Sequence, residues 1–227
     1  MRPHRGSPHS DAGRPAGRSP GGAVRPCGER ALLVEIDGHG AVHRLAALTR
    51  EHLGACAEEI VPGHRTVLVV GREQMPDAGR LGALAERAAA EAGAADGEPT
   101  GALVEIEVRY DGADIGEVAS LTGLSAEEVV RRHSAATYLV AFLGFAPGFA
   151  YLVGGDPLLA VPRREEPRSR VPAGSVAIAG PYSAVYPTAS PGGWRLLGTT
   201  DRVLFNPASG RPALLTAGAR VRFTELR

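Results

Sequence analysis

The sequence is poor in cysteine, in net charge and in long apolar runs, and each shortage excludes a class of protein. Only two of its 227 residues are cysteines, Cys27 and Cys56, which excludes a disulfide framework and a cysteine-based zinc site. The 25 Lys and Arg residues balance 25 Asp and Glu residues, so no net field attracts nucleic acid. No apolar run approaches the roughly 18 residues of a membrane span, and the first residues lack the apolar centre of a secretion signal. We therefore expect a cytoplasmic protein with no metal, no nucleic-acid partner and no membrane partner.

The first segment, residues 1–26, consists mainly of Arg, Pro, Gly, Ser and His. It cannot bury enough apolar surface to offset the entropy lost on ordering, so we predict a disordered tail. The remaining chain is predicted to divide into a small α/β domain at 27–109, a helical connector at 110–137 and a β-rich domain at 138–227.

Strand and helix patterns alternate in residues 27–109. Strand-like runs lie at 31–36, 59–61, 66–70 and 104–108, and helical spacing of apolar residues occurs at 42–56 and 77–92. The resulting order βαββαβ is typical of the ferredoxin-like split βαβ fold. The histidines of this segment have no carboxylate at ligand spacing, so we interpret them as ordinary surface residues.

The connector is predicted to hold two short helices that begin after Asp114 and Ser125. Both are suitable N-cap residues, each is followed three residues later by a Glu, and Gly123 suits the turn between the helices. The pattern resembles a helix-turn-helix. However, the second helix begins with Glu127 and Glu128 where a DNA reader needs cations and base-reading side chains, so DNA binding is not expected.

Short strand-like runs without intervening helices continue from residue 138 to the end. They lie at 138–143, 176–179, 184–186, 195–197, 203–205 and 220–223. Such strands must hide their edges by closure or by packing of two sheets, and a closed β-barrel satisfies this requirement. The predicted class is therefore α+β, with an N-terminal ferredoxin-like domain before a closed barrel.

Aromatic residues are concentrated in one part of the predicted barrel. The chain has five Phe, five Tyr and one Trp, and seven of these lie between Phe142 and Trp194. Glycines and prolines between them permit close backbone approach and stiffen the chain, as expected for a binding cleft. The candidate substrate-binding residues are Phe145, Pro147, Gly148, Tyr151, Ser190, Gly192, Gly193 and Trp194. Core packing or a partner interface remains an alternative role for the aromatic residues.

Positive charge is concentrated in the same region, in four arginines at positions 163, 164, 168 and 170. Guanidinium groups bind carboxylates or phosphates through paired hydrogen bonds, so this region predicts an anion site. The candidate catalytic residues are His133, Arg163, Arg168 and Ser175. Ion pairing with Glu165 and Glu166 is the alternative for the arginines, and a bond to a backbone carbonyl is the alternative for His133. The chain has no Walker A sequence, no GxSxG elbow and no cluster of metal ligands, so ATP hydrolysis by this chain alone is not expected.

Several motifs together resemble the KipI family, also known as the allophanate hydrolase subunit 1 family or the 5-oxoprolinase B-subunit family. They are LSAEEVV at 124–130, His133-Ser134, FLGFAPGFAYL at 142–152, PRR at 162–164, PRSRVPAGSVAIAG at 167–180, Tyr186-Pro187 and SPGGWRLLG at 190–198. The resemblance implies a small α/β domain followed by a cyclophilin-like β-barrel, as in subdomains C and D of carboxyltransferase domains. The sequence departs from the family at Tyr182-Ser183-Ala184, where Gln-Thr-Gly is common.

The resemblance also implies one component of an ATP-dependent 5-oxoprolinase. In that complex the chain would act with two partners, a KipA-like subunit together with a lactam-metabolising subunit, on a small lactam or amide, and ATP would be used by the complex. The family also contains KipI-type inhibitors of a sensor histidine kinase and components of carboxyltransferases. A ligand-binding barrel without chemistry of its own is a third possibility.

Overall fold

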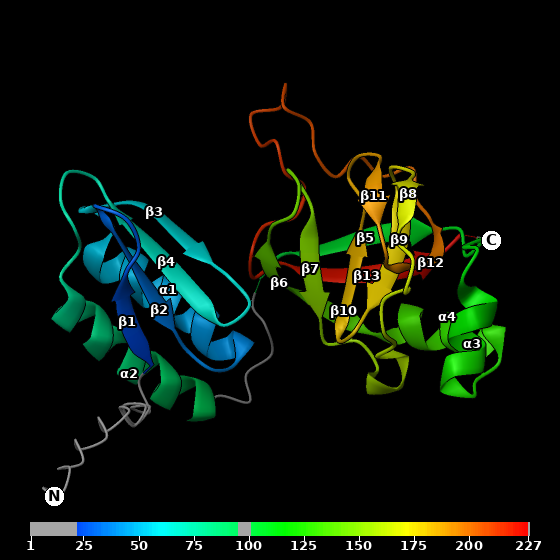
Figure 1. Cartoon of the computed structure of the whole chain (residues 1–227), viewed down its shortest axis with the longest axis horizontal. Coiled ribbons are helices and arrows are strands. Elements are labelled where there is room, and N and C mark those ends of the chain that lie inside the picture. Colours follow the sequence, from blue (N-terminus) through cyan, green and yellow to red (C-terminus); the bar gives the residue numbers. More distant parts are fainter. Residues whose placement is uncertain (1–21, 95–100, 227) are drawn as a thin grey trace, which may run out of the picture.

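The computed structural model describes residues 22–94 and 101–226, which form two lobes (Figure 1). The first lobe combines a small sheet with two long helices, and the second combines a larger curved sheet with two shorter helices. None of the helices in the described ranges is both long enough and apolar enough to cross a membrane.

The first lobe is organised around a four-stranded antiparallel sheet in the order β1-β2-β4-β3. Its elements are β1 (Ala23–Pro26), β2 (Ala31–Glu35), α1 (His39–Leu53), β3 (Ala57–Pro62), β4 (Thr66–Gly71) and α2 (Ala78–Ala94). Alternate residues of β4, Val67 and Val69, are completely buried, as are Leu45 of α1 and Leu81 of α2. They belong to one apolar cluster, so the helices cover the buried face of the sheet.

The predicted ferredoxin-like domain is wrong in its last strand. The run at 104–108 forms β5 (Leu103–Val108), but β5 pairs in parallel with β13 (Arg220–Glu225) of the second lobe. Ile106 and Val108 are buried in the core of that lobe, so packing there decides where the strand pairs. The place beside β2 that a final strand would take is filled by β1, which pairs antiparallel with β2.

The same strand β1 corrects the end of the predicted disordered tail. Residues 23–26 are paired with Leu32–Glu35, and Val24 packs against the core of the first lobe. Backbone pairing and this single apolar contact stabilise a strand that composition alone does not reveal. The rest of the predicted tail, residues 1–21, lies outside the described residues. The division of the chain into domains at residues 26, 109 and 137 stays a prediction.

The second lobe contains a seven-stranded sheet in the order β12-β9-β10-β7-β6-β13-β5, which curves into a nearly closed barrel (Figure 1). Its other strands are β6 (Thr137–Leu143), β7 (Ala150–Val153), β9 (Ser175–Ala179), β10 (Tyr182–Val185) and β12 (Arg195–Thr199). The predicted strand at 203–205 is wrong, since only Phe205 forms a bridge there, with Ala213. Closure is also incomplete, because in the described structure β5 itself does not pair with β12, and the two ends meet through the residues after β5, at the Arg109–Thr199 bridge and at the amides of Gly112 and Asp114.

Smaller elements complete the second lobe. The short strands β8 (Arg168–Val171) and β11 (Ser190–Gly192) form a separate two-stranded sheet, and a 3₁₀ turn, η1, spans Pro157–Leu159. The connector helices are α3 (Ile115–Thr122) and α4 (Ala126–Ala135), as predicted, and Gly123 ends α3 at φ 71°. Ser125 caps α4 by accepting a hydrogen bond from the Glu128 amide at 3.2 Å. Asp114 makes no such cap, because its carboxylate is used elsewhere.

Candidate functional site

A shallow hollow of about 80 Å³ gathers many of the predicted site residues on the second lobe. Its lining comes from the loop after β6, from β7, from the segment after η1, from the end of β10 and from β11 with the residues that follow it. The residues are Phe145, Phe149, Tyr151, Arg163, Tyr186, Pro191, Gly192, Gly193 and Trp194. We call this feature the aromatic hollow.

Arg163 is the charged group of the aromatic hollow. Its guanidinium carbon lies 5.9 Å from the centroid of the Trp194 ring, within cation–π range. Trp194 is buried and is held edge-on by Phe149 and Tyr151, at centroid distances of 5.6 and 5.7 Å. Arg163 has no acidic partner among the described residues. It is therefore an exposed, unneutralised cation beside an aromatic wall.

Phe145 stands at the rim of the hollow in a strained conformation. Its φ is 69°, the only positive φ of a non-glycine residue in the described chain, and 62% of the residue is exposed. A bulky side chain in this region costs energy and persists only where the surroundings impose it. Here the turn bonds from the Ala146 amide to the Gly144 carbonyl and from the Phe149 amide to the Ala146 carbonyl impose it. The turn thus presents an aromatic ring to solvent.

Only glycine fits at position 192, beside the Tyr186 hydroxyl. A Cβ at Gly192 would lie 2.3 Å from the Tyr186 hydroxyl oxygen, too close for any side chain. Tyr186 is itself buried, and burial raises the pKa of its hydroxyl above the ordinary value. The glycine therefore lets a neutral phenol reach the floor of the hollow.

Arg168 does not contribute to the aromatic hollow. Its Nη1 and Nη2 donate to the two carboxylate oxygens of Asp114 at 2.9 and 2.7 Å, and the Asp114 side chain is 3% exposed. Arg164 donates to the same carboxylate at 3.2 Å and to Glu117 at 3.2 Å. The alternative of ion pairs with Glu165 or Glu166 thus holds for neither Arg164 nor Arg168, since their partners are Asp114 and Glu117 at the start of α3.

Asp114 connects three parts of the chain. Besides the two arginines, it accepts a hydrogen bond from the Leu196 amide at 2.7 Å, which ties α3 to β12. Burial alone would raise the pKa of Asp114, but the Arg168 guanidinium and the Leu196 amide hold that pKa below its ordinary value. The sequence suggested a helix cap at this position, and only the fold shows that the carboxylate receives these donors.

His133 lies away from the aromatic hollow, at the floor of a second cavity of about 280 Å³. It is completely buried and stacks on Phe223 at 4.6 Å. Its Nδ1 lies 2.8 Å from the Tyr110 hydroxyl and its Nε2 lies 2.9 Å from Ser183 Oγ. Burial lowers the pKa of the imidazole to about 3, so the ring is neutral at pH 7. Its partners are side chains rather than the backbone carbonyl that we considered.

The remaining candidates are distributed around the hollow. Gly148 has φ 81° and packs against Phe205, while Pro147 is exposed beside it. Ser175 is buried at the start of β9, where its carbonyl accepts from the Tyr186 amide at 2.9 Å. Ser190 has a buried hydroxyl without a hydrogen-bond partner in the described structure. The roles that we predicted for all of these residues stay predictions.

Two histidines of the first lobe are less isolated than expected. The ring of His64 lies 5.4 Å from that of His39 and 5.8 Å from that of Tyr182, and its Nδ1 is hydrogen-bonded to the Tyr182 hydroxyl. His39 is partly buried and lines the second cavity. The surface interpretation therefore holds for His64, which is exposed although it contacts Tyr182, and is wrong for the partly buried His39. Within the described ranges, no cluster of three or more His, Cys, Asp or Glu residues could hold a metal ion.

Comparison with known proteins identifies the family of this chain. Residues 23–215 match the family described as carboxyltransferase domain, subdomain C and D. The chain belongs to this family. Its fold also resembles the urea carboxylase of Kluyveromyces lactis, with a TM-score of 0.66 at 20% identity over 90% of this chain and 22% of that one.

Two similar proteins carry the same name. The 5-oxoprolinase B subunit of Escherichia coli O157:H7 is 52% identical over 129 residues, which is 56% of this chain and 59% of that protein. The protein of the same name from Bacillus subtilis is 46% identical over 136 residues, 59% of this chain and 57% of that protein. The matches thus span somewhat more than half the length of each relative.

Proposed function

We propose that the chain is the B subunit of an ATP-dependent 5-oxoprolinase, which converts 5-oxo-L-proline, ATP and water into L-glutamate, ADP and phosphate. The observation that carries this proposal is the 43–52% identity to three proteins named as the B subunit of 5-oxoprolinase. In the proposal the chain works in the cytoplasm with a KipA-like subunit together with a lactam-metabolising subunit, and it is inactive by itself.

In this proposal the aromatic hollow holds the lactam. The carboxylate of 5-oxoproline would accept paired hydrogen bonds from Arg163, whose guanidinium is free of acidic partners in the described chain. The small ring would lie against Trp194 and Phe145, which form an apolar wall at the hollow. A volume of about 80 Å³ suits part of a small ring, so another subunit would cover the remainder.

Neither the aromatic hollow nor the largest groove of the described structure offers the residues that ATP needs. A triphosphate needs several cations or a row of backbone amides, and the aromatic hollow supplies one guanidinium. The larger groove of about 460 Å³ is no better, because its three carboxylates outnumber its two guanidinium groups and disfavour phosphates. We therefore assign nucleotide binding to the partner subunits.

Reconstitution tests the proposal. The chain is mixed with the KipA-like and lactam-metabolising subunits, and glutamate release from 5-oxoproline is measured with and without ATP. ATP-dependent glutamate release that requires this chain is the expected result. A complete mixture that releases no glutamate would overturn the proposed function.

The role of Arg163 has its own variant and control. Arg163→Lys keeps the charge but loses the paired hydrogen bonds, so kcat/KM should fall by roughly tenfold or more at an unchanged melting temperature. Arg170→Lys is the matched control, because Arg170 is exposed, has no acidic partner among the described residues and does not line the hollow. If Arg163→Lys and Arg170→Lys both keep full activity, the hollow is not the lactam site.

A further inference from the structure

The barrel has an open seam between its two end strands. β5 pairs with β13 on one side, and on the other side it has no neighbouring strand in the described structure. The residues after β5 close onto β12: the Arg109 and Thr199 backbones exchange hydrogen bonds of 2.8 Å, and the Gly112 and Asp114 amides donate to the Leu197 and Leu196 carbonyls at 3.1 Å. Beyond that bridge, the residues after β12 run away from β5 without pairing with it.

Backbone groups of β5 point into this seam. The Ala102 and Val108 carbonyls accept hydrogen bonds from β13 and its continuation, from the amides of Arg220 and Leu226. Since N–H and C=O groups alternate in direction along a strand, residues 104, 106 and 108 face β13, while 103, 105 and 107 face the seam. Arg109 obeys the same alternation, because its backbone meets Thr199 across the seam. The amides and carbonyls of Glu105 and Glu107 are thus left for another strand.

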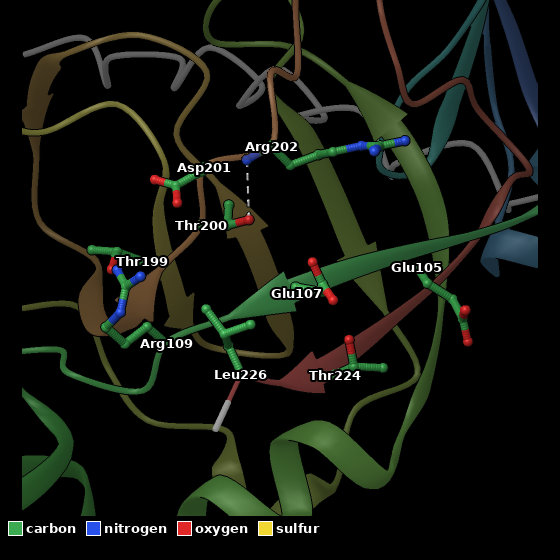
Figure 2. A pocket seen from close by; sticks show the side chains of 9 residues that line it. All are labelled: Glu105, Glu107, Arg109, Thr199, Thr200, Asp201, Arg202, Thr224 and Leu226. Carbon is green, nitrogen blue, oxygen red and sulfur yellow. Dashed lines mark hydrogen bonds between the residues drawn. The ribbon is translucent and has the colours of Figure 1, made fainter.

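A groove of about 460 Å³ lies along the seam (Figure 2). Glu105 and Glu107 of β5 lie on one side of it, and the segment Thr200–Arg202 lies on the other. Glu105 lies 3.8 Å from the exposed Arg222, a solvated contact that leaves its carboxylate accessible. Thr224 and Leu226 also line the groove, but they lie on the β13 side of β5, where the Leu226 amide donates to the Val108 carbonyl at 2.8 Å. The groove therefore combines free main-chain groups of β5 with three carboxylates, of Glu105, Glu107 and Asp201, against two guanidinium groups, of Arg109 and Arg202. Free main-chain groups and an excess of one charge are the components that strand addition needs.

We propose that this seam binds an extended segment of a partner subunit, which adds a strand to β5 and carries Lys or Arg opposite Glu105 and Glu107. Main-chain hydrogen bonds to residues 103, 105 and 107 would supply affinity. The carboxylates would select a basic segment, because opposite charges across strands are favourable and like charges are not. A second copy of this chain would place glutamates against glutamates, so self-pairing at this edge is disfavoured.

The inference rests on the proposed function for the identity of the partner, and amide exchange tests it separately from activity. In the free chain, NMR should show fast hydrogen exchange at the Glu105 and Glu107 amides and slow exchange at Ile106 and Val108. Binding of the KipA-like or the lactam-metabolising subunit should slow the first pair by about tenfold or more. Slow exchange at Glu105 and Glu107 in the free chain would mean that the seam is already closed and would overturn the inference.

Charge reversal gives the second readout. The double variant Glu105→Arg/Glu107→Arg should weaken copurification with the partner, raising its Kd by roughly tenfold or more. Glu58→Arg/Glu59→Arg is the matched control, since these exposed glutamates lie on β3, the end strand of the other sheet. If the unaltered chain binds no partner, the proposed function fails. If the unaltered chain binds the partner and both double variants bind it equally well, only the seam inference fails. A dimer of this chain that Glu105→Arg/Glu107→Arg abolishes would also overturn the seam inference.

Discussion

Replacing Arg168 by lysine should reduce the stability of the fold rather than change a ligand site. Arg168 donates two hydrogen bonds, of 2.9 and 2.7 Å, to the carboxylate of Asp114, whose side chain is 3% exposed. Lysine keeps the positive charge, but its compact ammonium reaches one carboxylate oxygen at a time. One charge-assisted hydrogen bond to a buried group is therefore lost.

The magnitude follows from that single bond. A hydrogen bond to a charged group contributes about 1.5–3 kcal/mol, and Arg164 also donates to Asp114, which softens the loss. We expect Arg168→Lys to lower the free energy of unfolding by about 1.5 kcal/mol. Asp114→Asn should cost more, about 3 kcal/mol, because it leaves the partly buried Arg168 without its counter-charge.

Urea unfolding followed by circular dichroism measures both changes through the transition midpoint. Arg170→Lys, an exposed neighbour on β8 without an ionic partner in the described structure, is the control and should stay within about 0.5 kcal/mol. The pH dependence adds a check on Asp114. Its lowered pKa means that its contribution is present above about pH 4 and is lost as the pH falls further, so the difference between the unaltered chain and Asp114→Asn should narrow there. An effect of Arg168→Lys no larger than that of Arg170→Lys would refute the reasoning.

Three further predictions concern separate parts of the chain. Phe145→Gly should leave the free energy of unfolding unchanged or raise it by up to about 1 kcal/mol, because it relieves the positive φ, while activity of the reconstituted complex should fall; a clear loss of stability would contradict the strain. Because the pKa of His133 is lowered to about 3, the unfolded chain binds one more proton than the folded chain between about pH 6.5 and 3. The free energy of unfolding should therefore decrease as the pH is lowered from about 6.5 to 3, and urea titrations of His133→Gln should show a smaller decrease. Deleting residues 1–21 should change the free energy of unfolding by no more than about 0.5 kcal/mol, whereas deletion through Pro26 removes β1 and should lower the melting temperature by several degrees; equal effects would show that β1 contributes nothing.

Local pattern was sufficient for the helices and for bringing several candidate residues into one region. Periodic apolar residues identified α1 and α2, and capping residues identified α3 and α4, because these features act within a few residues along the chain. The aromatic hollow was predictable for a similar reason. Phe145, Tyr151 and Trp194 belong to one dense run of aromatic residues and glycines, and the structure brings them together with Arg163.

Pairing between distant segments was decided only by the tertiary structure. The sequence of β5 suits either sheet, and only its burial against the core beside β13 places it in the second lobe. Likewise, four arginines in the sequence looked alike, but Asp114, some fifty residues earlier in the chain, neutralises Arg164 and Arg168 and leaves Arg163 free at Trp194. The local sequence determines which secondary structure a segment favours and which functional groups it offers. Which strand a β-strand pairs with, or which carboxylate neutralises an arginine, depends on the remote groups that the core brings within a few ångströms.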